Sequence, residues 1–288
     1  MKRIEKIERD AESHWVGDGF PVRTLFSYHS HGDAIDPFLL LDYAGPRAFA
    51  PADHPRGVGA HPHRGFETVT IVLQGEVEHR DSAGNHGVIG PGDVQWMTAA
   101  SGVIHEEFHS REFTRQGGTF EVLQLWVNLP SANKSDPPSY QDLRAASIPE
   151  VVLPNDAGTV RVIAGELYGE HGPARTHTPL WIADLSLAAG ASTRVDVPSQ
   201  STALLVVRSG RIAIAGDDSV PGVALIQLGR EGDGIEMSAE EESSVLAIAG
   251  MPIGEPVVGA GPFVMNTDEE IRAAYADYHA GRMGSLSM

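Results

Sequence analysis

The sequence of 288 residues contains no cysteine. Disulfide bonds, thiolate metal ligands and cysteine nucleophiles are therefore excluded, which leaves histidine, aspartate and glutamate to hold any metal ion. Basic residues are also few, with 21 Lys and Arg against 39 Asp and Glu and a formal net charge of −18. A surface this negative repels phosphate backbones, and because no basic patch offsets it, we expect no direct binding of nucleic acid.

Long hydrophobic runs are missing as well. No apolar segment of the sequence approaches the length of a membrane span. The first residues, MKRIEKIERDAESHW, are charged throughout and lack the apolar centre of a signal peptide. We therefore expect a cytoplasmic protein that has no membrane partner.

Turn-forming residues, in contrast, are abundant, with 32 glycines and 19 prolines. They separate short segments that are apolar or alternate between apolar and polar residues, such as TVTIVLQGEV (68–77), VQWMT (94–98), LWIADLSL (180–187) and SVLAIAG (244–250). Short strands with turns between them predict an all-β protein built from sandwiches or small barrels.

Two segments depart from this strand pattern. Residues 130–146 are polar and proline-rich, which indicates a linker between two domains. Near the end of the chain, Thr267 and Glu270 form the pattern of a capping box. The residues that follow have the apolar spacing of a helix that ends at a glycine: Ile271, Ala274, Tyr275, Tyr278 and Gly281.

The two halves of the chain form a weak internal repeat. Each has an apolar strand that runs into a glycine, followed by a turn and then Gly-Asp, as in TVTIVLQG…GPGDVQWM and TALLVVRSG…REGDGIEM. In this alignment the second half lacks the polar residues of the first, with Asp196, Pro198, Val245 and Ala247 in place of His61, His63, His105 and Glu107. The second half thus keeps the scaffold and loses the polar cluster.

The polar cluster of the first half has the spacing of metal ligands on strands. His61 and His63, in HPHRGFET (61–68), lie two residues apart, so on a strand both side chains project from the same face. His105 and Glu107, in GVIHEEFH (102–109), have the same relation. A barrel that brings these two strands together would supply three nitrogens and one carboxylate, leaving coordination positions open for a substrate or O₂.

Two other interpretations compete with this one. An isolated His-x-His pair in an acidic protein is more often solvated than bound to a metal. The stretch HEEFH (105–109) also fits the helical zinc-protease motif, in which Glu106 would be the general base. That motif needs a helix, whereas Val103 and Ile104 are β-branched residues that favour a strand.

Four separated motifs, HPHRGFETVT, GPGDVQWMTAASGVIHEE, LQLWVNLP and GPFVMNTDEEI, together resemble the pirin family, a branch of the cupin superfamily. The resemblance implies two jelly-roll-like cupin barrels in one chain and a short C-terminal helix. We assign residues 1–134 to a metal-binding barrel, 135–266 to a barrel without metal ligands, and 267–288 to the helix and tail. The resemblance also implies one divalent transition metal on His61, His63, His105 and Glu107, with Fe(II) expected and Mn, Co, Ni or Zn as alternatives.

Two further side chains are expected near the ligands without binding the metal. Cupins typically place a carboxylate ligand one residue beyond the position of Glu67, so Glu67 is expected beside the site. His109 shares the strand face of His105 and could line the mouth of the pocket, although a surface position is expected for it. Three histidines in turn-rich segments are expected to be solvated: His54, His79 and His86.

The resemblance points to two functions. Bacterial pirin-like proteins resemble quercetin 2,3-dioxygenases, which open the heterocycle of a flavonol such as quercetin with O₂. In that reading Glu107 is the catalytic residue that takes the proton of the flavonol hydroxyl, and the partners are a polyphenol and O₂. Alternatively, the resemblance implies an iron-dependent regulator that binds a protein partner according to the oxidation state of its metal and performs no catalysis.

Overall fold

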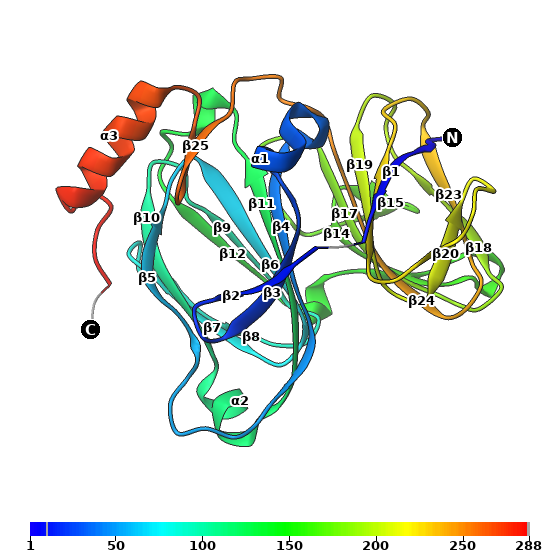
Figure 1. Ribbon diagram of the computed structural model, residues 1–288, viewed down its shortest axis with the longest axis horizontal. Helices are drawn as coiled ribbons and strands as arrows, with labels where there is room; N and C mark the ends of the chain where they lie inside the picture. Colours follow the sequence, from blue (N-terminus) through cyan, green and yellow to red (C-terminus); the bar gives the residue numbers. More distant parts are fainter. Residues whose placement is uncertain (10, 287–288) are drawn as a thin grey trace. The chain divides into compact units, whose positions relative to one another are not determined.

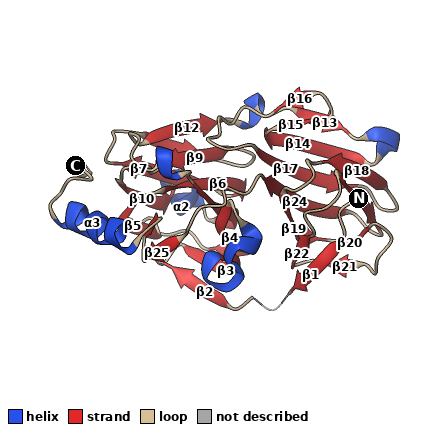
Figure 2. Cartoon of the chain, turned by 90° about the horizontal axis from the view of Figure 1, so that it is seen from above, coloured by secondary structure: helices blue, strands red, loops and turns tan. Residues whose placement is uncertain are grey.

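The protein, described here from a computed structural model that covers residues 1–9 and 11–286, consists mainly of antiparallel strands (Figures 1 and 2). Contacts divide the chain into two compact units. The first barrel comprises Glu12–Ser30, Phe38–Ala145 and Gly254–Met288, and the second comprises Met1–Ala11, His31–Pro37 and Ala146–Ile253. These units differ from the ranges 1–134 and 135–266, because each of them draws on segments that are distant in the sequence.

The first barrel contains two antiparallel sheets. The larger has seven strands in the order β12-β9-β6-β11-β4-β3-β2, and the smaller has four in the order β5-β10-β7-β8. The strands of the larger sheet are β2 (Ser13–Val16), β3 (Phe20–Ser27), β4 (Phe38–Phe49), β6 (Phe66–Gln74), β9 (Val94–Thr98), β11 (Gly118–Asn128) and β12 (Ser139–Leu143). Those of the smaller sheet are β5 (Gly57–His63), β7 (Val77–Asp81), β8 (His86–Ile89) and β10 (Val103–His109).

Buried apolar side chains from both sheets of the first barrel pack together. This cluster is formed by Phe20, Val22, Ala44, Phe49, Val72, Val77, Ile89, Phe113, Phe120 and Val122. The smaller sheet follows the two-residue period of a strand closely, because every second residue of β10 is buried. Its inward positions are Val103, His105, Glu107 and His109, so three of the four are polar.

The predicted linker at 130–146 is wrong over part of its length. Residues 139–143 form β12, which pairs with β9 from Ser139↔Thr98 to Leu143↔Val94. A strand forms here despite the proline-rich start because β9 offers a free edge for hydrogen bonding. The segment therefore completes the larger sheet of the first barrel.

The second barrel repeats this arrangement. Its larger sheet has the order β1-β22-β19-β24-β17-β14-β13 and its smaller sheet the order β18-β23-β20-β21. The strands are β1 (Ile4–Glu8), β13 (Glu150–Val152), β14 (Gly158–Ala164), β17 (Leu180–Leu187), β18 (Ser192–Asp196), β19 (Thr202–Ser209), β20 (Arg211–Ile214), β21 (Val220–Pro221), β22 (Ala224–Leu228), β23 (Gly234–Ala239) and β24 (Ser243–Gly250). Its core is aliphatic, and the inward positions of β19 hold Ala203, Leu205 and Val207.

Short elements complete the fold. Two hairpins are formed by β15 (Glu166–Leu167) with β16 (Glu170–His171) and by β25 (Val258–Ala260) with β26 (Phe263–Met265). The α-helices are α1 (Tyr28–His31), α2 (Arg111–Gln116) and α3 (Asp268–His279). None of the helices within the described ranges is long and apolar enough to cross a membrane.

The predicted C-terminal helix is confirmed as α3. The Thr267 hydroxyl accepts a hydrogen bond from the Glu270 amide at 3.2 Å, so the expected cap is formed. Ile271 and Ala274 are buried against Phe263 and Met265 of β26. Figure 1 shows α3 beside β25, and the helix contacts both strands of the β25–β26 hairpin.

Candidate metal centre

Strand pairing brings the predicted ligands together on the smaller sheet of the first barrel. β10 lies between β5 and β7, and in its register with β5 His105 stands directly opposite His61. On the other side of β10, Glu107 stands opposite His79 of β7. The strand also excludes the zinc-protease interpretation, because residues 103–109 do not form the helix that this motif requires.

The three predicted histidines converge. The ring centroids of His61 and His105 are 4.2 Å apart, those of His63 and His105 are 4.8 Å apart, and those of His61 and His63 are 4.9 Å apart. One ring nitrogen from each lies within 4.8 Å of those of the other two. This spacing suits three nitrogens that share one cation.

The hydrogen bonds of these rings leave nitrogens available. His61 donates from Nδ1 to the carbonyl of Gly59 at 2.9 Å, and His63 donates from Nδ1 to the carbonyl of Pro262 at 3.4 Å. Each Nε2 therefore remains an acceptor. His105 is fully buried, and neither of its ring nitrogens has a hydrogen-bond partner in the described part of the chain. An unpaired buried imidazole is costly, and a cation would satisfy it.

The environment keeps the imidazoles of His63 and His105 neutral, which is the form that binds metal. Burial, assisted by the neighbouring His61, lowers the pKa of His63 to about 3. Burial lowers the pKa of His105 well below its ordinary value, and the adjacent histidines act in the same direction. No proton has to leave either ring at neutral pH before a cation binds.

A glycine shapes the turn that follows His63. Gly65 has a φ of +90°, a backbone conformation that favours glycine. A Cβ at this position would lie 1.9 Å from the carbonyl oxygen of Val264, so no side chain fits there. The pattern His-Arg-Gly thus allows β26 to approach the strand that carries the histidine.

Glu107 is buried and accepts hydrogen bonds at both carboxylate oxygens. Thr70 and Gln95 each donate to Oε1 at 3.3 Å, and Gln124 donates to Oε2 at 2.9 Å. The ligand atoms of Glu107 lie within 4.8 Å of those of His105 and His79, and these three form a second group that could hold a metal. The structure thus has two overlapping groups that share His105, and Glu107 belongs to the one without His61 and His63.

A cavity of about 30 Å³ adjoins the cluster. Polar and apolar side chains both line it: Val16, Phe20, Val22, Asp42, Val58, His61, Thr70, Glu107, Val122 and Gln124. Asp42 was not predicted from the sequence. A single charged residue in the apolar run FLLLDY could have indicated a buried carboxyl group at this position. Burial raises the pKa of its carboxyl group, although the Thr24 hydroxyl donates to it at 2.5 Å.

The two side chains expected beside the ligands are both buried. Glu67 accepts a hydrogen bond from the Thr98 hydroxyl at 2.7 Å. His109 is only 2% exposed and donates from Nε2 to the carbonyl of Gly19 at 2.9 Å, so the expected surface position is wrong. Its ring packs among aromatic side chains because the inward face of β10 ends in the phenylalanine-rich core: Phe20, Phe49, Phe113 and Phe120.

The expectation for His79 is also wrong. His54 and His86 are exposed, as expected, but His79 is completely buried. His79 is buried because it lies on the inward face of β7, whose buried residues are Val77, His79 and Asp81. The spacing His79-x-Asp81 repeats the pattern of the predicted ligand pairs and could have identified it from the sequence.

Aromatic side chains pack around His63. The Phe66 ring is 5.1 Å from the His63 ring, and the Trp126 ring is 5.3 Å from it. Phe66 and Trp126 also pack on one another, with centroids 4.3 Å apart. These contacts fix the orientation of the His63 imidazole by packing.

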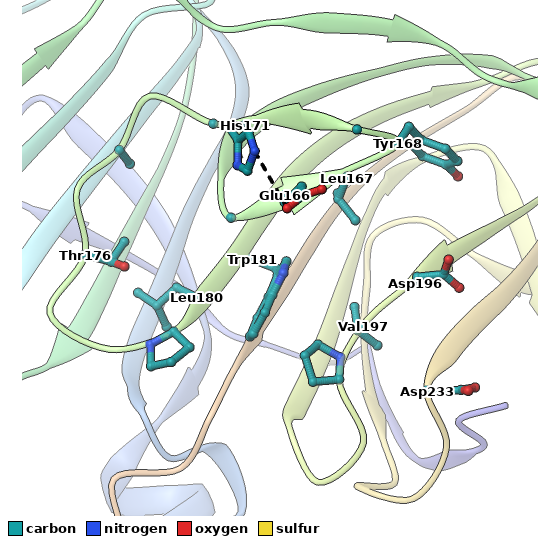
Figure 3. A pocket seen from close by; sticks show the side chains of 16 residues that line it. Glu166, Leu167, Tyr168, His171, Thr176, Leu180, Trp181, Asp196, Val197 and Asp233 are labelled. Atoms are coloured by element: carbon teal, nitrogen blue, oxygen red, sulfur yellow. Dashed lines mark ion pairs between the residues drawn. The ribbon is translucent and has the colours of Figure 1, made fainter.

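The second barrel has a larger cavity, of about 910 Å³, beside the β15–β16 hairpin (Figure 3). Trp181 is among the side chains that line it, and His171 forms an ion pair with Glu166 at 3.7 Å. Asp196 and Pro198, which the internal repeat aligns with His61 and His63, line this cavity. Within residues 1–9 and 11–286, both groups that could hold a metal belong to the first barrel, so this cavity contains neither.

Two cupin barrels in one chain, with the polar cluster in the first, define a bicupin. Family models of Pirin and of the Pirin C-terminal cupin domain match residues 19–127 and 182–284. A Pseudomonas aeruginosa protein whose name gives it provisionally as a quercetin 2,3-dioxygenase is 55% identical over 283 residues, 98% of each chain. Human Pirin is 39% identical over 257 residues, which is 87% of this chain and 83% of the human protein.

A solved structure shows the same similarity. Quercetin 2,3-dioxygenase from Acinetobacter baumannii superposes with a TM-score of 0.97 and 48% sequence identity, and the match covers 100% of both chains. The chain therefore belongs to the pirin family. The resemblance read from the four motifs and the expected fold, two cupin barrels with a short C-terminal helix, are both confirmed.

Proposed function

We propose that the first barrel binds one divalent transition metal ion through His61, His63 and His105, with Glu107 as the fourth ligand. The convergence of the three rings, with a buried and unpartnered His105, is the observation that carries this proposal. Three imidazoles and a carboxylate suit several first-row ions. Fe(II) is the ion we propose, with Mn, Co, Ni and Zn as alternatives.

We further propose that the protein is a dioxygenase that opens the heterocycle of a flavonol such as quercetin with O₂. The names of its bacterial relatives and the 48% identity over the whole chain support this activity. When bound, the metal would acidify a coordinated hydroxyl group and provide a redox-active centre for O₂. The residues of the chain then have to bind the flavonol, accept its proton and exclude water.

In this proposal Glu107 accepts the proton of the flavonol hydroxyl. The donors Thr70, Gln95 and Gln124 fix its carboxylate, so that it faces the cavity with a defined geometry. Apolar side chains that line the same cavity, Phe20 and Val22 among them, keep water away from the reacting group.

A flavonol can enter only if the cavity widens. Its volume of about 30 Å³ holds roughly one water molecule. Sites for larger organic ligands span roughly 300–1,000 Å³. Val16 and Phe20 line the cavity from the β2–β3 hairpin, so these side chains have to move when the substrate binds.

The test is elemental analysis of the purified protein followed by an oxygen-electrode assay with flavonols. We expect O₂ consumption with loss of the flavonol absorption band, and His63→Ala should abolish both. The matched control is His54→Ala, because His54 is exposed and lies outside both metal groups.

Absence of turnover at verified Fe, Mn, Co or Ni occupancy would contradict the dioxygenase proposal. Capture of a protein partner that changes with the oxidation state of the metal, without turnover, would instead support the regulatory function.

A further inference from the structure

The side-chain amide of Gln95 connects Glu107 to a buried network. Gln95, on β9, donates from Nε2 to Glu107 Oε1 at 3.3 Å and also faces Nδ1 of His79 at 3.2 Å. Its carbonyl oxygen accepts a hydrogen bond from the Tyr140 hydroxyl at 3.2 Å. Gln95 and His79 are both completely buried, so water does not compete for these contacts.

These contacts set the direction of each hydrogen bond. Because an amide nitrogen only donates, Nδ1 of His79 must accept from Gln95. The proton of a neutral His79 then sits on Nε2, which donates to Oδ2 of Asp81 at 3.2 Å. The Tyr140 ring stacks on the His79 ring, with centroids 5.1 Å apart at 23°, and holds it in this plane.

Asp81 is fixed at the far end of the network by the turn that follows β7. Its Oδ1 accepts from the backbone amides of Ala83 and Asn85, each at 2.9 Å. The Asn85 side chain donates to Oδ2 at 2.8 Å. The carboxylate of Asp81 has no hydrogen to donate and can only accept hydrogen bonds. His79 must therefore donate to it from Nε2.

We propose that Asp81 is a positioning residue: by fixing the His79 tautomer and thereby the Gln95 amide, it keeps a hydrogen-bond donor against Glu107. The chain of contacts runs from the β7 turn through three buried side chains to the carboxylate that faces the cavity. The expected effect of Asp81 on metal affinity rests on the proposed metal site. The expected tautomer of His79 does not depend on that site.

Asp81→Asn reverses the network without changing its shape. The backbone amides of Ala83 and Asn85 keep the amide oxygen on their side, so the new amide nitrogen faces His79. The Asn85 side chain, which donates to Oδ2 in the native protein, has to turn its own amide oxygen toward this nitrogen. His79 must then accept at Nε2 and carry its proton on Nδ1. Gln95 has to turn its carbonyl oxygen toward that proton, and this oxygen then meets the carboxylate of Glu107, where two acceptors repel.

The direct test is nuclear magnetic resonance of metal-free protein labelled with ¹⁵N-histidine. At about pH 8, above the ordinary histidine pKa, we expect the His79 proton on Nε2 in the native protein and on Nδ1 in Asp81→Asn. His79→Gln identifies the signal by its loss. A native His79 protonated on Nδ1, or an unchanged tautomer in Asp81→Asn, would overturn the inference.

The second test measures the affinity for Co(II) alone. Loss of a group that orients a ligand typically weakens metal binding about 10–100-fold, and we expect this range for Asp81→Asn. The matched control is Glu78→Gln on the same strand, where Glu78 contacts the exposed His86 at 3.1 Å, and its affinity should equal that of the native protein. Tyr140→Phe should weaken Co(II) binding less than Asp81→Asn does, because Asp81 still sets the direction of the hydrogen bonds through His79 and Gln95.

The two tests separate this inference from the proposed function. If the native protein binds no Co(II) or other first-row ion, the metal site fails, and the tautomer measurement still decides the role of Asp81. If the native protein binds Co(II) and Asp81→Asn binds it equally well, the positioning role is refuted while the metal site stands.

Discussion

The buried neutral histidines make the metal-free protein sensitive to mild acid. Burial lowers the pKa of His63 to about 3 in the folded protein, against 6.5 for an ordinary histidine. Above pH 6.5 the ring is neutral in the folded and the unfolded chain, so it contributes nothing to the pH dependence. Below pH 6.5 the unfolded chain binds the proton more readily, and the free energy of unfolding falls until the pH approaches 3.

The size of this loss follows from the shift. At pH 5 the unfolded histidine lies 1.5 pH units below its pKa, and each unit corresponds to about 1.4 kcal/mol. His63 alone should therefore cost about 2 kcal/mol of stability between neutral pH and pH 5. His105 acts in the same direction, because its pKa is also lowered by burial.

Urea unfolding of the metal-free protein, followed by tryptophan fluorescence at about pH 7.5 and about pH 5, measures this loss. In His63→Gln the loss between the two pH values should be smaller by about 2 kcal/mol. Acid-sensitive groups distant from His63 remain in both proteins and cancel in the comparison. Removing His63 also relieves part of the lowering of the His105 pKa, which changes the loss in the same direction. His54→Gln, which changes an exposed ring, should lose as much stability as the native protein. Equal losses in the native protein and His63→Gln would refute the reasoning.

Three further predictions concern the surroundings of the site. Lys134→Met should lower the free energy of unfolding by roughly 3 kcal/mol in a thermal melt. The reason is that the buried Lys134 ammonium donates hydrogen bonds to Gly65, Asn128 and Val264 at 2.8–2.9 Å. The control Lys6→Met, at an exposed lysine, should change the free energy of unfolding little. Gln124→Leu removes the 2.9 Å donor to Glu107 and should weaken Co(II) binding about tenfold by titration; unchanged affinity would contradict the role given to this contact. Thr267→Ala removes the cap of α3 and should cost about 1 kcal/mol without changing metal affinity.

The part of the site that could be read from the sequence is the part set by strand periodicity. His61 with His63, and His105 with Glu107, are expected on one strand face because side chains alternate, and the ring nitrogens of the three histidines lie within 4.8 Å of one another. The capping box at Thr267 was equally readable, because its contacts are local.

Contacts between distant strands could not be read in this way. His79 reaches Gln95 only because β7 and β9, in different sheets, face each other across the barrel interior. Glu107 groups with His79, and the pairing of β10 with β5 is irregular between His105 and Glu107. Lys134 is buried because acceptors from three separate segments surround its ammonium group, which no local pattern in a polar, proline-rich stretch reveals.

The Nδ1–H of His63 donates a hydrogen bond to the carbonyl of Pro262, and the neighbouring Arg64 pairs with Asp277 of α3 at 2.5 Å. Both partners follow the histidine by some 200 residues in the sequence. During synthesis on the ribosome, the histidines emerge long before the segment that orients one of them. A nascent chain therefore lacks the partner of His63 Nδ1, and the candidate site becomes complete only after residues 262–277 have been made.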